Sequence, residues 1–193
     1  MKIGLLGGTF NPVHTGHLIL AQECWAALDL ERVVFIPAYI PPHKPLACDV
    51  SAPDRLNMLR LALEGDERFD ISTFEIDKGG RSYSIDTIRY IEQLYRGRAE
   101  IFFLTGADSA DTLPAWKDID NILEKVNFVI ATRPRWSGIT PFEARVTRIT
   151  MPSIDISSSD IRERIEGRQP IDFLVPEKVV RYIRKKGLYR SAR

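Results

Sequence analysis

The sequence alternates short apolar runs with amphipathic segments along almost its whole length, and this alternation constrains the fold more than any other feature. Strand-like runs cover 2–7, 32–37, 69–75, 100–105, 127–132 and 148–152. Helical spacing of apolar residues covers 15–28, 54–64, 84–96, 119–125, 158–166 and 176–185. Strands separated by helices pair in parallel through right-handed crossovers, with helices on both faces of the sheet. We therefore expect an α/β class with a Rossmann-like parallel sheet, and a loop over the proline-rich segment 38–53.

The chain of 193 residues is long enough to bury one substantial core. With no internal repeat and no linker, we expect a single domain over 1–193, whose C-terminal helical segment 153–193 carries the stretch "ISSSDIRERI". Its 27 basic and 26 acidic residues give a formal charge of +1, which argues against a dedicated nucleic-acid or membrane-surface protein. No apolar stretch reaches membrane-spanning length, and Cys24 and Cys48 lack the spacing of a zinc site. These features predict a reduced, cytoplasmic enzyme and leave a homo-oligomer open.

The stretch "IGLLGGTFNPVHTGHL", residues 3–18, joins the end of the first predicted strand to the first predicted helix. In parallel sheets, ligands bind at the carboxyl ends of strands, where the strand order reverses. Gly7 and Gly8 suit a tight turn in which backbone approaches a ligand closely, or a turn that needs a positive φ. Their spacing matches neither the G-x-G-x-x-G fingerprint nor a Walker A loop.

Two histidines follow these glycines and admit three interpretations. His14 and His17 are three residues apart, so they share a helix face, and Gly16 between them indicates close packing against the backbone. As isolated residues they could simply pack or lie at the surface. A zinc site needs further ligands, and the third histidine lies in a loop without a cysteine cluster. Phosphate recognition by imidazole donors at a helix start, where the dipole favours anions, accounts for every residue of the stretch.

The segment "SSSDIR", residues 157–162, predicts a helix start. A serine cap and an acidic residue in the first turn are ordinary capping chemistry, which needs only one serine. Three hydroxyls, unpaired amides and a guanidinium at one helix start also suit a polyphosphate.

The stretch "GGTFNPVHTGH" resembles the H-x-G-H signature of the nucleotidyltransferase superfamily, which is related to the HIGH-type motif of class I aminoacyl-tRNA synthetases. The superfamily's second phosphate motif is matched by "ISSSDIRERI", and between the two lie "IPAYIPPHKP", "GGRSYSIDT" and "TGADSADTLPAWK". This set, in this order over nearly the whole chain, is similar to the bacterial nicotinate-nucleotide adenylyltransferases. The resemblance implies the nucleotidyltransferase type of the fold. It also implies transfer of the adenylyl group of ATP to nicotinate mononucleotide, giving nicotinate adenine dinucleotide and pyrophosphate.

The resemblance also implies residue roles. His14 and His17 would be catalytic. The second phosphate motif would hold the β- and γ-phosphates of ATP. The ATP-binding residues would be Gly7, Gly8, Thr9, Phe10, Gly16, Ser157, Ser158, Ser159 and Arg162.

The mononucleotide site is implied at Tyr83, Ser84, Asp108, Trp116, Lys117, Lys44 and Arg133. An aromatic face with helix-start N–H groups suits a flat ring that carries a carboxylate, and Ser84 is expected to cap its helix. Alternatives stay open for Trp116 as core packing, for Asp108 as a helix cap and for Lys44 as a solvated loop charge. The family often has Asn where this chain has Ala38, which puts one mononucleotide contact in doubt.

Magnesium is expected to enter with ATP, because the sequence shows no carboxylate cluster for a dedicated protein site. The expected partners are ATP and nicotinate mononucleotide, with no nucleic acid and no membrane. One alternative is another small-molecule adenylyltransferase of the superfamily, such as phosphopantetheine adenylyltransferase, against which "SYSIDT" and "PAWK" speak. The other alternative is a non-catalytic adenine-nucleotide sensor.

Overall fold

The computed structural model describes residues 1–42, 50–132 and 140–190. Its centre is a six-stranded sheet in the order β3-β2-β1-β4-β5-β6, and every neighbouring pair is parallel. The strands are β1 (Lys2–Gly8), β2 (Arg32–Pro37), β3 (Phe69–Ile71), β4 (Glu100–Gly106), β5 (Asn127–Thr132) and β6 (Val146–Thr150). The chain adds strands on one side of β1 and then returns to add β4 on the other side, so the order reverses between β1 and β4. The predicted Rossmann-like parallel sheet is confirmed.

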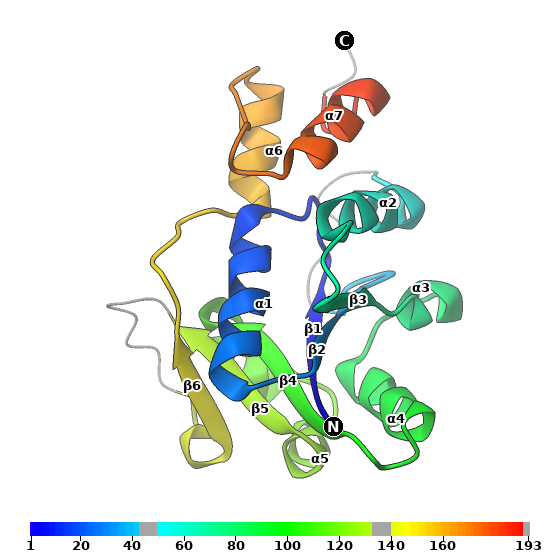
Figure 1. Ribbon diagram of the computed structural model, residues 1–193, viewed down its shortest axis with the longest axis vertical. Coiled ribbons are helices and arrows are strands. Elements are labelled where there is room, and N and C mark those ends of the chain that lie inside the picture. The colour runs from blue at the N-terminus through cyan, green and yellow to red at the C-terminus, as the bar shows by residue number, and fades with distance from the viewer. Residues whose placement is uncertain (43–49, 133–139, 191–193) are drawn as a thin grey trace.

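Helices cover both faces of this sheet (Figure 1). Leu6 of β1 belongs to a core shared with α1 (Thr15–Leu28), α2 (Ala52–Leu63), α6 (Ser158–Glu166) and α7 (Glu177–Lys186). Its neighbour Leu5 faces the opposite core, shared with α4 (Ser84–Leu94), α5 (Ile119–Lys125) and the 3-10 helix η1 (Ala107–Ala115). This alternation follows from the two-residue side-chain period of a strand. No helix within the described ranges has both the length and the apolar character needed to cross a membrane.

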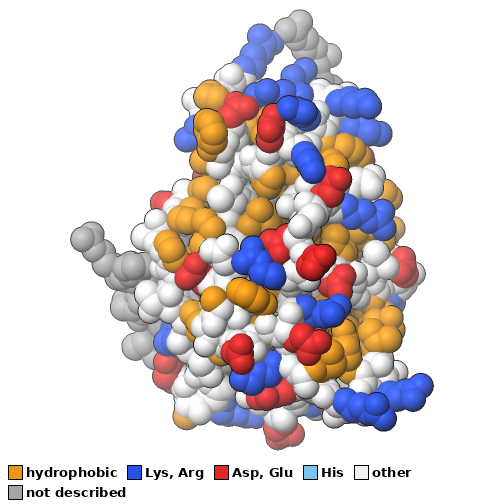
Figure 2. Space-filling view, in the orientation of Figure 1, with side chains coloured by type: hydrophobic (Ala, Val, Ile, Leu, Met, Phe, Trp, Pro, Cys, Tyr) orange, Lys and Arg blue, Asp and Glu red, His pale blue; other side chains and the backbone are white. Residues whose placement is uncertain are grey.

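The last two helices stand beyond the carboxyl ends of the strands, at the end of the molecule that holds the start of α1 (Figure 1). Lys and Arg side chains gather there over α7 (Figure 2). The last turn of α7 contains Arg184, Lys185 and Lys186. Positive charge at a helix C-terminus is favourable, and Gly187 ends the helix in the left-handed region at φ 65°.

The segment predicted as one strand over 69–75 is divided in the structure. β3 ends at Ile71, and the short helix α3 (Phe74–Lys78) begins three residues later. β3 is an edge strand that pairs only with β2, so few ladder bonds extend it. The Thr73 hydroxyl donates to the Asp77 carboxylate at 2.6 Å, which favours a helical turn at this point.

Two further elements begin two residues earlier than predicted. α2 begins at Ala52, inside the segment expected to be a loop, because Pro53 falls in the first helical turn, where its missing N–H is not needed. The Ser51 hydroxyl caps this helix by accepting the Asp54 N–H at 3.1 Å. The last strand runs over β6, two residues earlier than the predicted 148–152, because its register pairs Val146 with β5.

We expect Ser51→Ala to lower the free energy of unfolding by about 1 kcal/mol, since the cap of α2 is lost. Urea unfolding measures this difference. Ser51→Thr keeps a capping hydroxyl and should stay close to the wild-type protein. Equal stability of the alanine variant and the wild type would show that the cap contributes nothing.

Candidate active site

Two adjoining cavities open where the strand order reverses, at the carboxyl ends of the strands. The first has a volume of about 380 Å³ and the second about 210 Å³. Both are lined by Gly7, Thr9, Pro41 and Thr105. A ligand that fills one cavity therefore lies against the wall of the other, as required of a site that joins two molecules.

The first cavity brings the two predicted phosphate motifs together. His14 and His17 line it beside Ser157, Ser158, Ser159 and Arg162. The motifs are also in direct contact: the Ser158 hydroxyl donates to the Pro12 carbonyl at 2.9 Å. The Arg162 guanidinium donates to the Asn11 carbonyl at 2.8 Å. The start of α6 is thus fastened to the loop that precedes α1.

The two imidazoles stack on each other, with ring centroids 3.7 Å apart. The backbone N–H of His14 donates to His17 Nδ1 at 3.2 Å, so the neutral His17 ring carries its proton on Nε2. Burial holds the pKa of His17 well below its usual value of 6.5, and the nearby His14 lowers this pKa further. At neutral pH His17 is therefore an uncharged ring with one N–H donor for a ligand in the cavity.

The glycines around these histidines make room for aromatic rings. A Cβ atom on Gly16 would lie 3.1 Å from Nδ1 of His14, so the close packing predicted there is with this imidazole. A Cβ on Gly8 would lie 2.9 Å from the Phe10 ring, whose residue sits at φ 48°. Gly7 and Gly8 belong to β1 and neither has a positive φ, so the interpretation as a positive-φ turn is wrong. Gly7 is exposed and has no side chain, so its backbone is accessible from both cavities.

The three serines of the second motif have different partners. Ser157 caps α6: its hydroxyl accepts the Asp160 N–H at 3.1 Å and donates to the Asp160 carboxylate at 2.7 Å. The Ser158 hydroxyl donates to the loop before α1, as described above. The Ser159 oxygen accepts an Arg162 N–H at 3.0 Å. Only the Ser159 proton is therefore left, among these three hydroxyls, to donate to a ligand.

The second cavity contains four of the residues predicted to bind the mononucleotide. It is lined by Tyr83, Ser84, Trp116 and Lys117. The half-buried Trp116 packs edge-on against Phe103 and Phe128, each at a centroid distance of 5.8 Å. Lys117 Nζ lies 4.4 Å from the Tyr83 ring centroid. Trp116 thus combines core packing, which was the alternative interpretation, with a surface on the cavity.

The cap of α4 differs from the prediction. Tyr83 occupies the N-cap position without a side-chain capping bond, and Ser84 is the first residue of the helix. The expectation that Ser84 is the cap is wrong. The first N–H groups of a helix have no acceptor within it, so this helix start still offers donors to the second cavity.

Of the other residues predicted to bind the mononucleotide, the structure describes Asp108. Asp108 is exposed and lines the first cavity. Lys44 and Arg133 lie outside the described residues. Ala38, where a mononucleotide contact was in doubt, lines the second cavity with its small side chain.

Arg55 is a residue of this region that sequence analysis did not select. Its side chain is fully buried, and it donates to the Thr9 carbonyl at 2.7 Å and to the Tyr39 carbonyl at 2.9 Å. These carbonyls follow β1 and β2, so Arg55 ties together the two loops at the rim of the cavities. The sequence did contain a signal for this role: Arg55 is four residues before Leu59 and so lies on the buried, apolar face of α2, where a charged side chain is unusual.

Glu75 was also not selected. It lines the second cavity and is 8% exposed. The Thr87 hydroxyl donates to its carboxylate at 2.5 Å. Burial raises the pKa of Glu75, and hydrogen bonds from Thr87 and Ser82 oppose that rise. Glu75 therefore joins α3 to α4 behind the turn that holds Tyr83.

No group of three or more His, Cys, Asp or Glu side chains in the described part of the chain is arranged to hold a metal ion.

Known proteins resemble this chain in sequence over most of its length. A family model described as cytidylyltransferase-like matches residues 5–164. A relative from Geobacillus thermodenitrificans, named probable nicotinate-nucleotide adenylyltransferase, is 46% identical over 188 residues, covering 97% of this chain and 86% of the relative. A relative of the same name from Halalkalibacterium halodurans is 42% identical over 191 residues, covering 98% of this chain and 92% of the relative.

Solved structures share the fold at lower identity. The Plasmodium falciparum nicotinic acid mononucleotide adenylyltransferase complexed with NaAD has a TM-score of 0.81 at 16% identity, with 97% of both chains covered. The predicted nucleotidyltransferase type of the fold is therefore confirmed. From the family model and the sequence relatives together, the chain belongs to the cytidylyltransferase-like family and, within it, to the nicotinate-nucleotide adenylyltransferases.

Proposed function

We propose that the protein transfers the adenylyl group of ATP to nicotinate mononucleotide, giving nicotinate adenine dinucleotide and pyrophosphate. The observation that carries this proposal is the pair of adjoining cavities: one is lined by both phosphate motifs, the other by Trp116 and the start of α4. The names of the sequence relatives support the same reaction.

The reaction needs alignment and charge stabilisation rather than a base. A phosphate oxygen of the mononucleotide attacks the α-phosphorus of ATP in line. The new P–O bond forms as the bond to the β-phosphate oxygen breaks, and its electron pair leaves with pyrophosphate. The nucleophile is already an anion, so no proton must be removed. Holding two polyanions in line and stabilising the leaving charge is the whole catalytic task.

The first cavity supplies donors for this task. His17 offers its Nε2–H as a neutral donor, and the start of α1 adds its dipole. At the start of α6, Ser159 offers a hydroxyl proton. Arg162 has five N–H groups, of which its contacts with Asn11 and Ser159 engage two. We assign these α6 groups to the leaving pyrophosphate.

The second cavity would hold the pyridine ring. Its carboxylate would meet the helix-start N–H groups of α4, and Trp116 would stack on the ring. Lys117 would add positive charge nearby.

We assign magnesium to the phosphates of ATP and water, where it would neutralise charge, since the described residues form no ligand set for it. The two cysteines without a disulfide framework favour a cytoplasmic location.

The direct test is release of pyrophosphate from ATP in the presence of nicotinate mononucleotide, its amide form or phosphopantetheine. We expect rapid release with the first compound and formation of the dinucleotide by chromatography. Faster release with phosphopantetheine would assign another adenylyltransferase activity. ATP binding without release in any mixture would identify a nucleotide sensor.

We expect His17→Ala to lower kcat/KM by about a hundredfold to a thousandfold, since one preorganised donor to a phosphate is lost. Steady-state kinetics measure the change, and circular dichroism confirms that the variant is folded. Gln22→Ala, at an exposed position of the same helix, is the matched control and should retain full activity. Near-normal turnover by the His17 variant would contradict the assigned role.

Trp116→Ala should raise the KM for nicotinate mononucleotide by about tenfold or more, because the stacking surface is removed. The KM for ATP should change less than about twofold, because ATP occupies the first cavity. Trp116→Phe keeps an aromatic face and should recover most of the affinity. Equal losses for both substrates in the alanine variant would indicate that Trp116 only packs the core.

A further inference from the structure

Asn11 connects the first cavity to the C-terminal end of the chain. It lies in the loop between β1 and α1, lines the first cavity and is 3% exposed. Its backbone carbonyl accepts the Arg162 N–H at 2.8 Å. The position of the guanidinium therefore depends on the position of this buried loop.

Tyr189 reaches the same loop from the end of the described chain. Its hydroxyl donates to Asn11 Oδ1 at 2.8 Å. The residue is brought there by the turn that ends α7, in which Gly187 is left-handed and the Leu188 N–H donates to the Ile183 carbonyl at 3.1 Å. Tyr189 itself packs against the core on the α1 face of the sheet.

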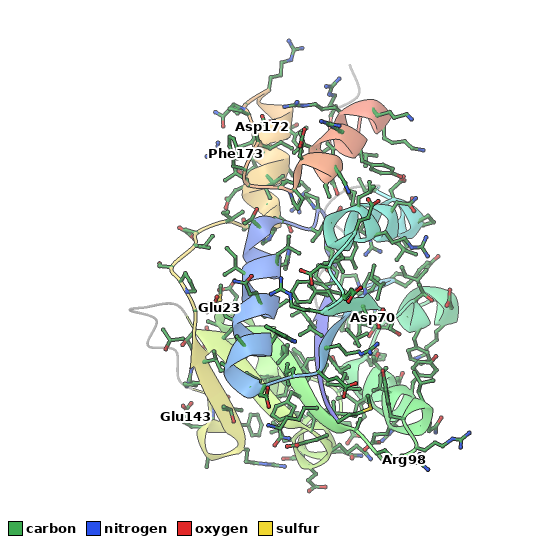
Figure 3. All side chains as sticks on the ribbon, in the orientation of Figure 1. Glu23, Asp70, Arg98, Glu143, Asp172 and Phe173 are labelled. Carbon is green, nitrogen blue, oxygen red and sulfur yellow. The ribbon has the colours of Figure 1, made fainter. Side chains whose placement is uncertain are left out.

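A second contact holds the C-terminal helices against the start of α1. Phe173 lies in the connection between α6 and α7 (Figure 3). Its carbonyl accepts the Thr15 hydroxyl at 3.0 Å, and the Leu174 carbonyl accepts the Thr15 N–H at 2.9 Å. The connection between α6 and α7 and the turn that follows α7 thus contact the histidine segment on both sides of His14.

We propose that Tyr189 is a positioning residue of the nucleotide site. Its hydroxyl fixes the Asn11 side chain, and the Asn11 carbonyl in turn fixes the Arg162 guanidinium against the pyrophosphate end of the triphosphate. This inference rests on the proposed function for the assignment of Arg162 to pyrophosphate. Tyr189 touches no substrate and acts only through the loop.

The physical reason is the buried amide. Loss of the Tyr189 hydroxyl removes a hydrogen bond that Asn11 Oδ1 accepts at a position with almost no access to water, so water cannot readily replace that bond. The peptide after Asn11 carries the carbonyl that orients Arg162. Charge-assisted bonds from a guanidinium to phosphate depend on this orientation, because the fork of donors is planar and rigid.

Tyr182 offers a matched control in the same part of the fold. Its hydroxyl donates to the Asp54 carboxylate at 2.7 Å and accepts the Asn57 amide at 3.3 Å. These contacts join α7 to α2, and none of the three residues lines either cavity. Removing this hydroxyl costs the fold a comparable hydrogen bond without touching the loop.

The experiment compares Tyr189→Phe with Tyr182→Phe in the full chain. Isothermal titration with inorganic pyrophosphate gives its Kd, and steady-state kinetics give KM for each substrate and kcat. We expect Tyr189→Phe to raise the pyrophosphate Kd and the ATP KM by about fivefold to tenfold, with the mononucleotide KM changed less than about twofold. Tyr182→Phe should lower only the thermal midpoint. If both variants lower the midpoint and neither alters pyrophosphate binding, Tyr189 is merely structural and the proposal fails.

A double-mutant cycle tests the route through Arg162. In an Arg162→Ala background, Tyr189→Phe should weaken pyrophosphate binding no further, because the group that Tyr189 positions is gone. An undiminished effect in that background would overturn the proposal. Pyrophosphate binding can be measured without the mononucleotide, so the cycle tests the role of Tyr189 separately from the reaction. A wild-type protein that binds pyrophosphate and forms no dinucleotide would refute only the proposed function.

Discussion

Two hydrogen bonds from the start of α6 to the loop before α1 hold the site together. The Ser158 hydroxyl and the Arg162 guanidinium donate to consecutive carbonyls, those of Pro12 and Asn11. A parallel sheet with its order reversed between β1 and β4 supplies the place where these segments can meet. After β6 the chain crosses beyond the strand ends to reach α6 (Figure 1), so the fold must be nearly complete before the first cavity exists.

The electrostatics of the site combine uncharged donors, the Arg162 guanidinium in the first cavity and the buried Arg55 guanidinium behind the rim. His17 is held neutral by its surroundings, and the helix starts add partial positive charge without a titratable group. Behind the rim, the buried Arg55 carries a full positive charge and donates to the backbone carbonyls of Thr9 and Tyr39. Carbonyls turned inward leave the N–H groups of the same planar peptides directed away from Arg55. The rim can therefore present amides to anionic ligands.

Local patterns predicted most of the framework, because buried strands and amphipathic helices leave a periodic signature. They predicted less of the hydrogen bonding. The three serines at 157–159 look equivalent in sequence, yet Ser157 caps the helix and Ser158 bonds to a distant loop. Asp108 was predicted to bind the mononucleotide, and the sequence did not indicate that it lines the first cavity, because the direction of a side chain after a strand end depends on the turn that follows. Arg55 and Glu75 pair with groups far along the chain, and periodicity carries no information about such pairs.

The wall common to the two cavities has a consequence for inhibitor chemistry. Gly7 has no side chain there, and both cavities reach it, so a short linker could pass over this residue and join an aromatic acid to a phosphonate in one compound. Each half would hold the other at high effective concentration, and the affinity of the joined compound could exceed that of either half by orders of magnitude. A larger side chain at position 7 would abolish this chelate advantage and leave each half-compound its own cavity.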